Sequence, residues 1–382
     1  MIHIVLGTKA QLIKMAPIMV RLTEQNVPYN FISTGQHRAT MKEMLGEFGL
    51  KQPDVVLYDG PDIVSLPKML LWMLRILWRC VFSRRRIFGE QPTGMVLVHG
   101  DTFSTLLGAL MGRLAGLRVG HVESGLRSFN LLHPFPEELT RVLTFRLSHT
   151  LYCPGRWAMD NVANLRKEKI DTISNTMADA VALALKMERR RDHVPVEPFG
   201  LVSLHRYENI FRKQVFERII HLLESVAREQ RLLFILHPPT AKQLDRLGFR
   251  ARLEANPQIE LRPRYTYFDF VSLIEAAEFV ITDGGSIQEE SCYLGVPCLL
   301  MRKATERQEG LGENVVLSNY DPDVIEQFVR SAATYRREPV LTGARASDII
   351  IAHAHGTAHL SDENTRGRGP NKEPQVLACS HS

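Results

Sequence analysis

Short apolar segments recur along the first half of the chain, and each ends near glycine or a polar residue and is followed by a segment with helical spacing of apolar residues. An apolar run of this length fits a strand that is buried on both faces, and strands that alternate with helices build a parallel sheet. The sequence predicts five such strands here: Ile2 to Leu6, Tyr29 to Ser33, Gly94 to Val98, Leu117 to Val122 and Thr150 to Cys153.

A second series of the same kind begins after residue 175. It comprises Gly200 to Leu204, Leu232 to Leu236, Ile259 to Leu261, Glu278 to Thr282 and Pro297 to Met301. We therefore expect an α/β protein with two Rossmann-like parallel-sheet domains, residues 1–173 and 174–355, that face each other across a substrate cleft. We expect the last helix to pack back on the N-terminal domain. Residues 356–382 are polar with few apolar anchors and are expected to form a disordered tail.

The composition indicates which kind of ligand and which cellular compartment to expect. The 382 residues are 45% hydrophobic and 23% charged, which excludes global disorder. A net charge of +5 suits an anionic small substrate better than a nucleic acid, which needs a clustered basic face. The five cysteines form no Cys-x-x-Cys pair, so we expect no disulfide framework and no zinc site of standard spacing. With no signal-peptide pattern at the N-terminus, we expect a cytoplasmic protein.

Three carboxylates follow strand ends or open a helix in the first domain. Asp101 and Glu123 come after successive predicted strands, and Glu137 lies in the first turn of a predicted helix. Each alone is compatible with a structural role, as a helix cap or an ordinary helix start. Ligands of open parallel sheets bind beyond the carboxyl ends of the strands, and crowded carboxylates raise one another's pKa. Together the three acids therefore favour acid–base chemistry.

The second domain offers groups that suit a diphosphate. His205 and Arg206 follow a predicted strand, and Gly284, Gly285 and Ser286 form a turn that opens a helix. Backbone N–H groups at such a turn can hold a phosphate, and Glu290, one turn further, can accept from ribose hydroxyls. The glycines could equally be packing residues, since a glycine turn alone is weak evidence.

Taken in order, these motifs resemble the UDP-N-acetylglucosamine 2-epimerase family over roughly residues 1 to 350. The matching segments are GTKAQLIKMAP, TGQHR, HGDTFS, HVESGLRS, PFPEE followed by Arg141, HRYEN, SIQEE and TERQE. The resemblance implies a GT-B fold, a homodimer and a UDP-sugar substrate, with no metal and no cofactor. Non-hydrolysing members interconvert UDP-GlcNAc and UDP-ManNAc by eliminating UDP to a 2-acetamidoglucal and adding it back.

The resemblance also implies roles for single residues. Asp101, Glu123 and Glu137 resemble the catalytic acids, and His205 resembles the histidine near the leaving diphosphate. The positions implied in substrate binding are Lys9, Lys14, Arg141, His205, Arg206, Phe270, Gly284, Gly285, Ser286, Glu290 and Arg307. Some bacterial members bind a regulatory second UDP-GlcNAc at the TGQHR segment, which marks Gln36 and His37 as regulatory positions without implying that this chain is regulated.

The chain departs from the family pattern around the nucleotide. Lys9 stands where the family has arginine, and a lysine keeps the charge but loses forked binding. Gln11 replaces an acid, Ser286 is displaced by two positions, and Gln308 replaces a proline. The acid–base set is intact while the periphery is altered, so the epimerase chemistry is better supported than the identity of the sugar.

Alternatives remain at this point. One is a 2-epimerase of a modified UDP-2-acetamido sugar, such as a diacetamido uronic acid. Another is a hydrolysing 2-epimerase that releases free ManNAc and UDP, because the two types differ only in whether water or UDP adds to the glycal. The others are a GT-B glycosyltransferase, which the three acids disfavour, and a non-enzymatic or membrane-associated partner protein.

One segment stands apart from these motifs. Residues 66–82 are almost continuously apolar, interrupted by Lys68, Arg75 and Arg79 at helical spacing and followed by three arginines. The segment is too short and too charged to span a bilayer. It predicts either a helix buried in the first domain with its basic stripe toward water, or an interfacial amphipathic helix that makes a peripheral membrane contact.

Overall fold

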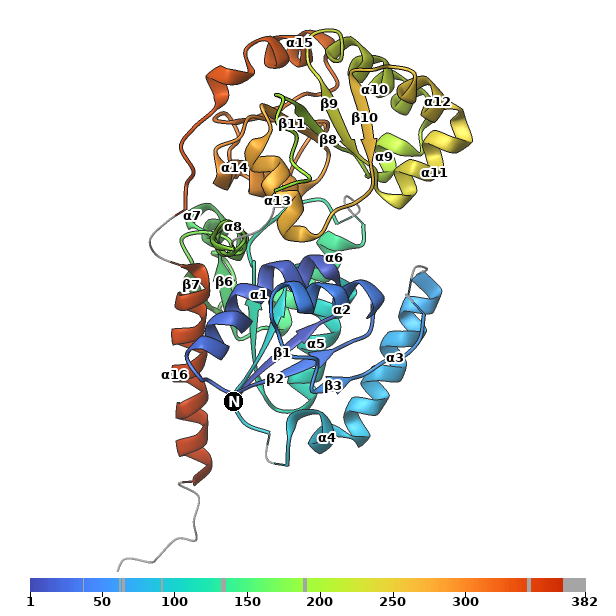
Figure 1. Cartoon of the computed structure of the whole chain (residues 1–382). Coiled ribbons are helices and arrows are strands. Elements are labelled where there is room, and N and C mark those ends of the chain that lie inside the picture. The colour runs from blue at the N-terminus through green and yellow to red at the C-terminus, as the bar shows by residue number, and fades with distance from the viewer. Residues whose placement is uncertain are drawn as a thin grey trace, which may run out of the picture.

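The computed structural model describes residues 1–36, 38–61, 63, 66–90, 92–131, 135–187, 191–341 and 345–366. It contains two parallel sheets, one in each half of the chain, with helices on their faces (Figure 1). This confirms the predicted fold class, two Rossmann-like α/β domains in the GT-B arrangement.

The first sheet has seven strands in the order β3-β2-β1-β4-β5-β6-β7. All its pairings are parallel, and β1 and β4 are fully buried because helices cover both faces. Its strands are β1 (Ile2–Leu6), β2 (Tyr29–Ser33), β3 (Val55–Val56), β4 (Met95–His99), β5 (Arg118–Val122), β6 (Thr150–Cys153) and β7 (Glu168–Asp171). Its helices are α1 (Lys9–Glu24), α2 (Arg38–Glu47), α3 (Leu66–Phe82), α4 (Arg84–Phe88), α5 (Phe103–Leu114), α6 (Glu137–Leu147) and α7 (Arg156–Asn161).

The second sheet has six parallel strands in the order β10-β9-β8-β11-β12-β13. Its strands are β8 (Gly200–Ser203), β9 (Leu232–Ile235), β10 (Ile259–Arg262), β11 (Phe279–Thr282), β12 (Cys298–Leu300) and β13 (Val315–Leu317). Its helices are α9 (Tyr207–Ile210), α10 (Lys213–Val226), α11 (Pro238–Leu247), α12 (Phe249–Glu254), α13 (Tyr267–Ala276), α14 (Gly285–Leu294), α15 (Pro322–Arg330) and the 3-10 helix η1 (Ala332–Tyr335).

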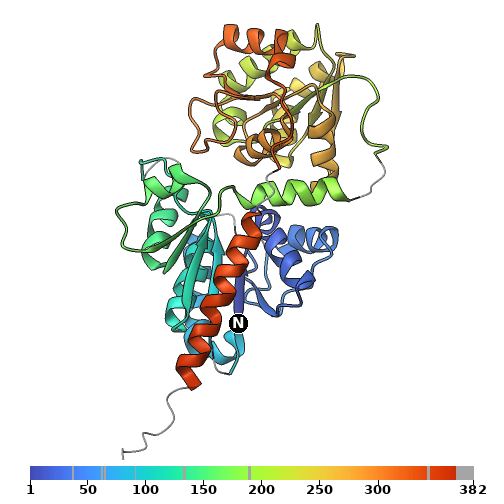
Figure 2. The ribbon, with the colours of Figure 1, turned by 90° about the vertical axis from the view of Figure 1, so that its left-hand side faces the viewer.

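Two helices connect the halves. Helix α8 (Thr176–Lys186) lies between the sheets, against α1 on one side and α13 and α14 on the other (Figure 2). Helix α16 (Ala346–Arg366) returns to the first domain and lies along α1, β1 and β4. The buried residues Ile350 and Ala354 anchor it there.

The C-terminal segment differs in part from the expected tail. The sequence places the start of disorder at residue 356, whereas α16 continues to Arg366. Extending an anchored helix costs little, because each added residue gains a backbone hydrogen bond without a new nucleation step. The rest of the expected tail, 367–382, lies outside the described residues.

Candidate active site between the two domains

Four charged side chains, three of them buried and the fourth 12% exposed, join the domains. Lys14 on α1 and Glu123 after β5 come from the first domain, and Glu289 on α14 and Arg307 come from the second. Lys14 Nζ contacts the Glu123 carboxylate and lies 2.9 Å from Glu289 Oε2. Arg307 lies 2.7 Å from Glu289 and 3.6 Å from Glu123. Buried charges are tolerated only when paired, so this Lys14–Arg307 network fixes how the two domains face each other.

Glu123 is held in an unusual backbone conformation at the end of β5. Its φ is 63°, in the left-handed region that costs a non-glycine residue energy and is common at functional sites. Asn175 donates to its carboxylate at 2.6 Å. Burial raises its pKa, but Lys14 and Arg307 oppose this, and the pKa lies well below its ordinary value. Glu123 is therefore a fixed negative charge at neutral pH.

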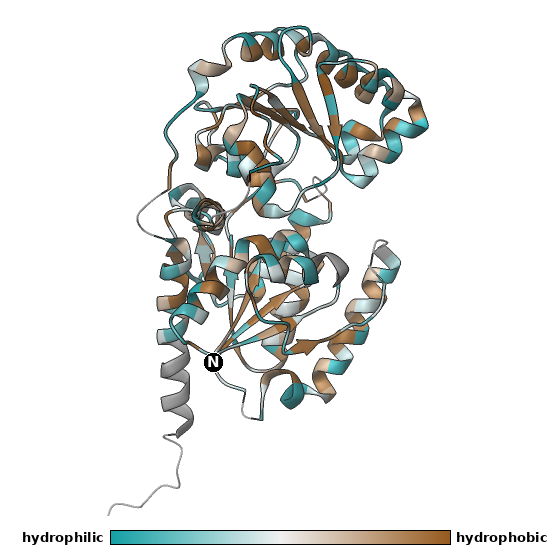
Figure 3. Ribbon diagram, viewed as in Figure 1, coloured by the Kyte–Doolittle hydropathy of each residue, from teal (hydrophilic) through white to brown (hydrophobic). Residues whose placement is uncertain are grey.

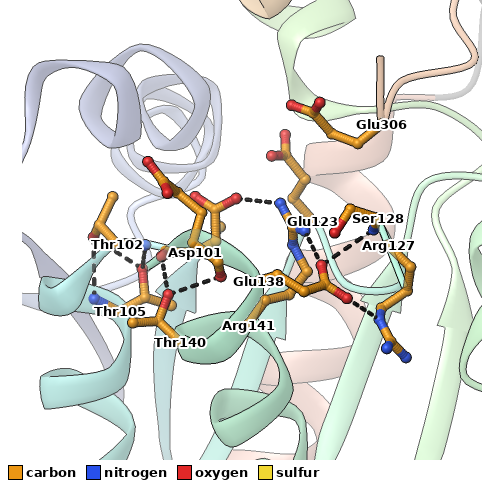
Figure 4. Close-up of polar contacts among 12 residues, drawn as sticks. Asp101, Thr102, Thr105, Glu123, Arg127, Ser128, Glu138, Thr140, Arg141 and Glu306 are labelled. Carbon is orange, nitrogen blue, oxygen red and sulfur yellow. Dashed lines mark hydrogen bonds and ion pairs between the residues drawn. The ribbon is translucent and has the colours of Figure 1, made fainter. Parts of the chain in front are cut away.

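A second polar cluster surrounds Asp101 (Figure 4). Arg141 contacts Asp101 with one guanidinium nitrogen and lies 2.5 Å from Glu138 with another. Glu138 is fully buried and also accepts from Arg127 at 2.5 Å. Because Glu138 is saturated by two arginines, it positions Arg141. Of the two adjacent acids at the start of α6, it is Glu137 that remains available for chemistry.

Glu137 has the properties of a proton-transfer group. Its Oε2 atom is buried and has no hydrogen-bond partner among the described residues. Burial raises its pKa, the nearby charge of Asp101 raises it further, and Arg206 of the second domain opposes both. A carboxyl group with a raised pKa and an unoccupied oxygen is suited to proton transfer.

His205 is positioned by Asp283. The fully buried Asp283 carboxylate accepts from the backbone N–H groups of His205 and Arg206, both at 3.0 Å, and from Asn209 at 2.8 Å. The His205 ring stacks on His237 with centroids 4.4 Å apart. Burial lowers the pKa of His205, which favours the neutral ring at pH 7. The loop thus presents a neutral imidazole beside a cationic Arg206.

A cavity of about 470 Å³ lies between the domains beside this histidine. Its walls combine an aromatic ring, Phe270, with two ionisable groups, the half-buried Lys9 and the buried Glu290. Both domains contribute, and the lining residues are Thr8, Lys9, Ala10, Ile13, His205, Ile235, His237, Arg264, Tyr265, Thr266, Tyr267, Phe270, Ser286, Ile287 and Glu290. The size and mixed lining suit a nucleotide.

A smaller cavity of about 200 Å³ shares His205 and Ser286 with it and reaches Arg206 and Arg307. Its floor is the N-terminus of α14, where unpaired N–H groups favour an anion. Glycine at position 285 leaves room for Arg307, because a Cβ atom would lie 2.6 Å from Arg307 Nε and displace that side chain. The two cavities together offer an aromatic wall at one end and a diphosphate site at the other.

The protonation of Glu290 should make the stability of the protein depend on pH. Burial raises its pKa to about 8 from an ordinary 4.5, so between these values the folded state holds a proton that the unfolded chain releases. The stabilisation that this group contributes is fully present below its pKa in the unfolded chain, and it is lost as pH rises through its pKa in the folded state. We expect Glu290→Gln to remove this loss, so that thermal unfolding midpoints of variant and wild type diverge as pH rises from 5 toward 8. A constant difference between them, or the same divergence in the exposed control Glu326→Gln, would contradict this.

The structure gathers most of the predicted site residues around the cleft. Lys9, His205, Phe270, Ser286 and Glu290 line the larger cavity, and Arg206, Gly284, Gly285 and Arg307 line the smaller one. Lys14 and Glu123 lie in the network between the domains, and Asp101, Glu137 and Arg141 at the adjoining end of the first sheet.

Gln36, one of the two regulatory positions, does not line either cavity. Gln36 is buried and accepts from Ser104 at 2.6 Å, and His37 lies outside the described residues. Sequence reasoning missed Glu289 and His237. Glu289 lies within the recognised SIQEE motif, and His237 follows a predicted strand. Both positions were therefore visible in the sequence, but the residues that they contact in the fold were not.

The chain is similar to known proteins over most of its length. The family profile described as UDP-N-acetylglucosamine 2-epimerase matches residues 21–350. The chain is 34% identical over 341 residues to the UDP-N-acetylglucosamine 2-epimerase of Methanococcus maripaludis, covering 85% of this chain and 89% of that relative. It is 30% identical over 335 residues to the UDP-2,3-diacetamido-2,3-dideoxy-D-glucuronate 2-epimerase of Pseudomonas aeruginosa, covering 84% and 89%.

The fold is likewise similar to that of a solved relative. The crystal structure of UDP-GlcNAc 2-epimerase from Neisseria meningitidis, bound to UDP-GlcNAc, superposes with a TM-score of 0.78 at 27% identity, covering 93% of this chain and 99% of that one. With the profile match over most of the chain, this shows that the protein belongs to the UDP-N-acetylglucosamine 2-epimerase family.

Proposed function

We propose that this chain is a non-hydrolysing 2-epimerase that interconverts UDP-GlcNAc and UDP-ManNAc. The observation that carries the proposal is Glu137, a half-buried carboxyl with a raised pKa and one buried, unoccupied oxygen, beside Asp101 and close to Arg206 of the second domain. This combination supplies an acid–base group where the sugar of a UDP-sugar would lie if its diphosphate bound the second domain.

The substrate would bind along the two cavities. Phe270 would stack on uracil, and Glu290 would accept from ribose hydroxyls. The diphosphate would bind at the N-terminus of α14, close to His205 and Arg206. In this proposed pose, carbon 1 and carbon 2 of the sugar would lie at the Asp101 and Glu137 end of the cleft.

The reaction would proceed by elimination and re-addition. A carboxylate takes the weakly acidic proton from carbon 2 while the bond from carbon 1 to the diphosphate oxygen breaks, which leaves a carbon–carbon double bond and free UDP in the site. The cations near the diphosphate stabilise the charge on the leaving group. A proton then returns to the opposite face of carbon 2 as UDP adds back to carbon 1. Glu137 fits proton transfer, whereas the ionised Glu123 fits electrostatic stabilisation.

Product analysis tests this proposal against its alternatives. We expect purified protein and UDP-GlcNAc to give UDP-ManNAc on anion-exchange chromatography. Free ManNAc with UDP would favour a hydrolysing epimerase. No reaction with UDP-GlcNAc but turnover of a UDP-diacetamido uronic acid would favour the modified substrate. Two observations support this alternative: the similarity to the Pseudomonas enzyme, and the lysine at position 9 where the family has arginine. Transfer of the sugar to an added acceptor would favour a glycosyltransferase.

Phe270 gives a test of the nucleotide position. Phe270→Ala should weaken UDP binding by about tenfold while changing turnover at saturating substrate much less, because stacking on the base is lost far from the reacting carbons. Isothermal titration calorimetry with UDP measures the binding. The control Phe82→Ala removes an exposed phenylalanine outside both cavities and should leave UDP affinity unchanged. Equal UDP affinity in Phe270→Ala and wild type would show that the uracil position is wrong.

We also propose that the enzyme is a cytoplasmic homodimer that supplies a cell-surface polysaccharide precursor. The family resemblance supports the dimer and the pathway. Cys80, Cys153, Cys292 and Cys298 are free thiols, which suits a reducing compartment. Sedimentation of the purified protein at a monomer's rate would contradict the dimer.

A further inference from the structure

Helix α10 presents a side of mixed character to a cavity of about 510 Å³ in the second domain. Figure 3 shows apolar and polar residues next to one another along this helix. Its lining residues recur at helical spacing from the N-cap onward: Arg212, Val215, Arg218, Ile219 and Leu222. Helix α9 and the loops after β12 and β13 supply the rest of the wall. A volume of this size is typical of a small-molecule site.

This cavity is separate from the candidate active site. It shares no lining residue with the two cavities in which the UDP-sugar is proposed to bind. The described residues that line it include four cations and one acid: Arg212, Arg218, Arg302, Lys303 and Glu208. The acid already pairs with Arg206 at 3.4 Å. The cavity therefore has an excess of positive charge that its own residues do not neutralise.

Arg302 is the buried cation of this set. It is 6% exposed, and its Nη1 atom has no hydrogen-bond partner among the described residues. Its Nη2 atom donates to Glu306 at 3.2 Å. Burial and the charge of Arg206 lower the pKa of Arg302, and they outweigh the opposite effect of Glu306. Because a buried polar group without a partner costs free energy, this unpaired nitrogen points to a ligand that accepts hydrogen bonds.

The charge and the apolar wall together indicate the kind of anion. A phosphate monoester carries about two negative charges at neutral pH, whereas a carboxylate carries one, and arginine binds phosphate oxygens in pairs. Val215, Ile219 and Leu222 form an apolar wall that inorganic phosphate alone would leave uncovered. We propose that this cavity binds an organic phosphate, with the phosphate group at Arg302 and an apolar or aromatic part against α10.

Glu306 connects Arg302 to the proposed diphosphate site. It lies 4.0 Å from Arg206, and it lines the same small cavity as Arg206 and Arg307. Burial raises the pKa of Glu306, but the three arginines lower it to about 2. A phosphate that competes for Arg302 would leave Glu306 to Arg206 and Arg307, and would make these two less available to UDP. Anions at neighbouring sites also repel each other. Occupancy should therefore weaken UDP binding, an effect that rests on the proposed function.

Tyr320 gives the cavity a second connection to the same site. It lines the cavity with a φ of 61°, which is uncommon for a residue with a large side chain. Its hydroxyl donates to Asn209 at 2.6 Å, and Asn209 donates to Asp283 at 2.8 Å. Asp283 in turn accepts from the His205 backbone N–H. A ligand that contacts Tyr320 would thus contact a residue joined by hydrogen bonds to the loop that carries His205.

Isothermal titration calorimetry of the full chain with 1-naphthyl phosphate and with inorganic phosphate tests the site. We expect 1-naphthyl phosphate to bind at least about tenfold more tightly, because only this probe covers the apolar wall. The double variant Arg212→Gln, Lys303→Gln removes two exposed cations of the cavity and should weaken this binding by at least about tenfold. The charge-matched control Arg228→Gln, Lys242→Gln changes exposed residues outside the cavity and should bind as wild type does.

Titrations at rising fixed concentrations of UDP separate this cavity from the UDP site. The dissociation constant of 1-naphthyl phosphate should rise by at least about fivefold and then reach a plateau, and saturating probe should weaken UDP binding by the same factor. Both double variants should keep the wild-type affinity for UDP, which establishes that they are folded.

The outcomes that count against the proposal are distinct. A dissociation constant that rises with UDP without limit would place the probe in the UDP site and overturn the proposal. So would absence of probe binding in the wild type, or equal losses of binding in the two double variants. UDP affinity that is unchanged by saturating probe would overturn the coupling between the sites. A protein that binds the probe in the cavity but does not bind UDP would contradict the proposed function and still support this cavity.

Discussion

Glu137→Gln is expected to lower the turnover number by at least about a hundredfold, the scale of a lost acid–base group. Glutamine keeps the shape of the side chain but cannot release or take up a proton at neutral pH. Because the group would act on the sugar and lies apart from the nucleotide cavity, UDP affinity should change less than about threefold. Steady-state kinetics with UDP-GlcNAc and calorimetry with UDP measure the two effects separately.

The matched control is Glu326→Gln, which neutralises an exposed glutamate on α15 and should leave both values unchanged. The prediction concerns Glu137 and not its neighbour Glu138, whose carboxylate is already paired with Arg127 and Arg141. Near-normal turnover in Glu137→Gln would remove it from the chemistry. A parallel loss of UDP affinity and turnover would instead indicate that the substitution disturbs the cleft.

Lys14→Met should produce the largest loss of stability. It leaves Arg307 as the one remaining cation of the network beside the buried carboxylates of Glu123 and Glu289. Removing one partner of a buried ion pair typically costs about 3–5 kcal/mol. The pKa of Glu289 is already raised to about 7 by burial and should rise further. We expect the free energy of unfolding in urea to fall by about this amount.

The double variant Lys14→Met, Glu289→Gln should regain part of the loss, because the uncompensated charge is removed along with its partner. The control Arg231→Met breaks exposed ion pairs to Glu197 and Glu260 and should cost less than about 1 kcal/mol. An equal, small effect of Lys14→Met and Arg231→Met would show that the network does not hold the two domains together.

Central strands could be predicted because both faces of them are buried. A strand such as β1 is a continuous apolar run, so its limits are visible in the sequence, and the predicted Tyr29 to Ser33 agrees with β2. The strands β3, β7 and β13 at or near the sheet edges were missed. They are short, and β3 and β7 have no buried residue, so they carry little hydrophobic signal.

The site could be predicted only as far as its residues lie in local motifs. The acids at strand and helix ends were visible, because their position follows from the fold class. The contacts between these residues could not be predicted, because they join residues far apart in the sequence. Examples are the ion pair of Lys14 with Glu289 and the hydrogen bond that the His205 backbone N–H donates to Asp283. Helix α3 shows the same limit. Its basic residues are exposed, as expected, but spacing could not tell which of its apolar residues the core would cover.

Proton NMR of the purified protein with UDP-GlcNAc in deuterium oxide tests the central claim most directly. Removal of the carbon-2 proton by a carboxylate in contact with solvent predicts UDP-ManNAc with deuterium at carbon 2, and gradual deuteration of UDP-GlcNAc at the same carbon. UDP-ManNAc that retains its original proton at carbon 2 would contradict proton exchange at this site. Free ManNAc as the sole product would contradict re-addition of UDP.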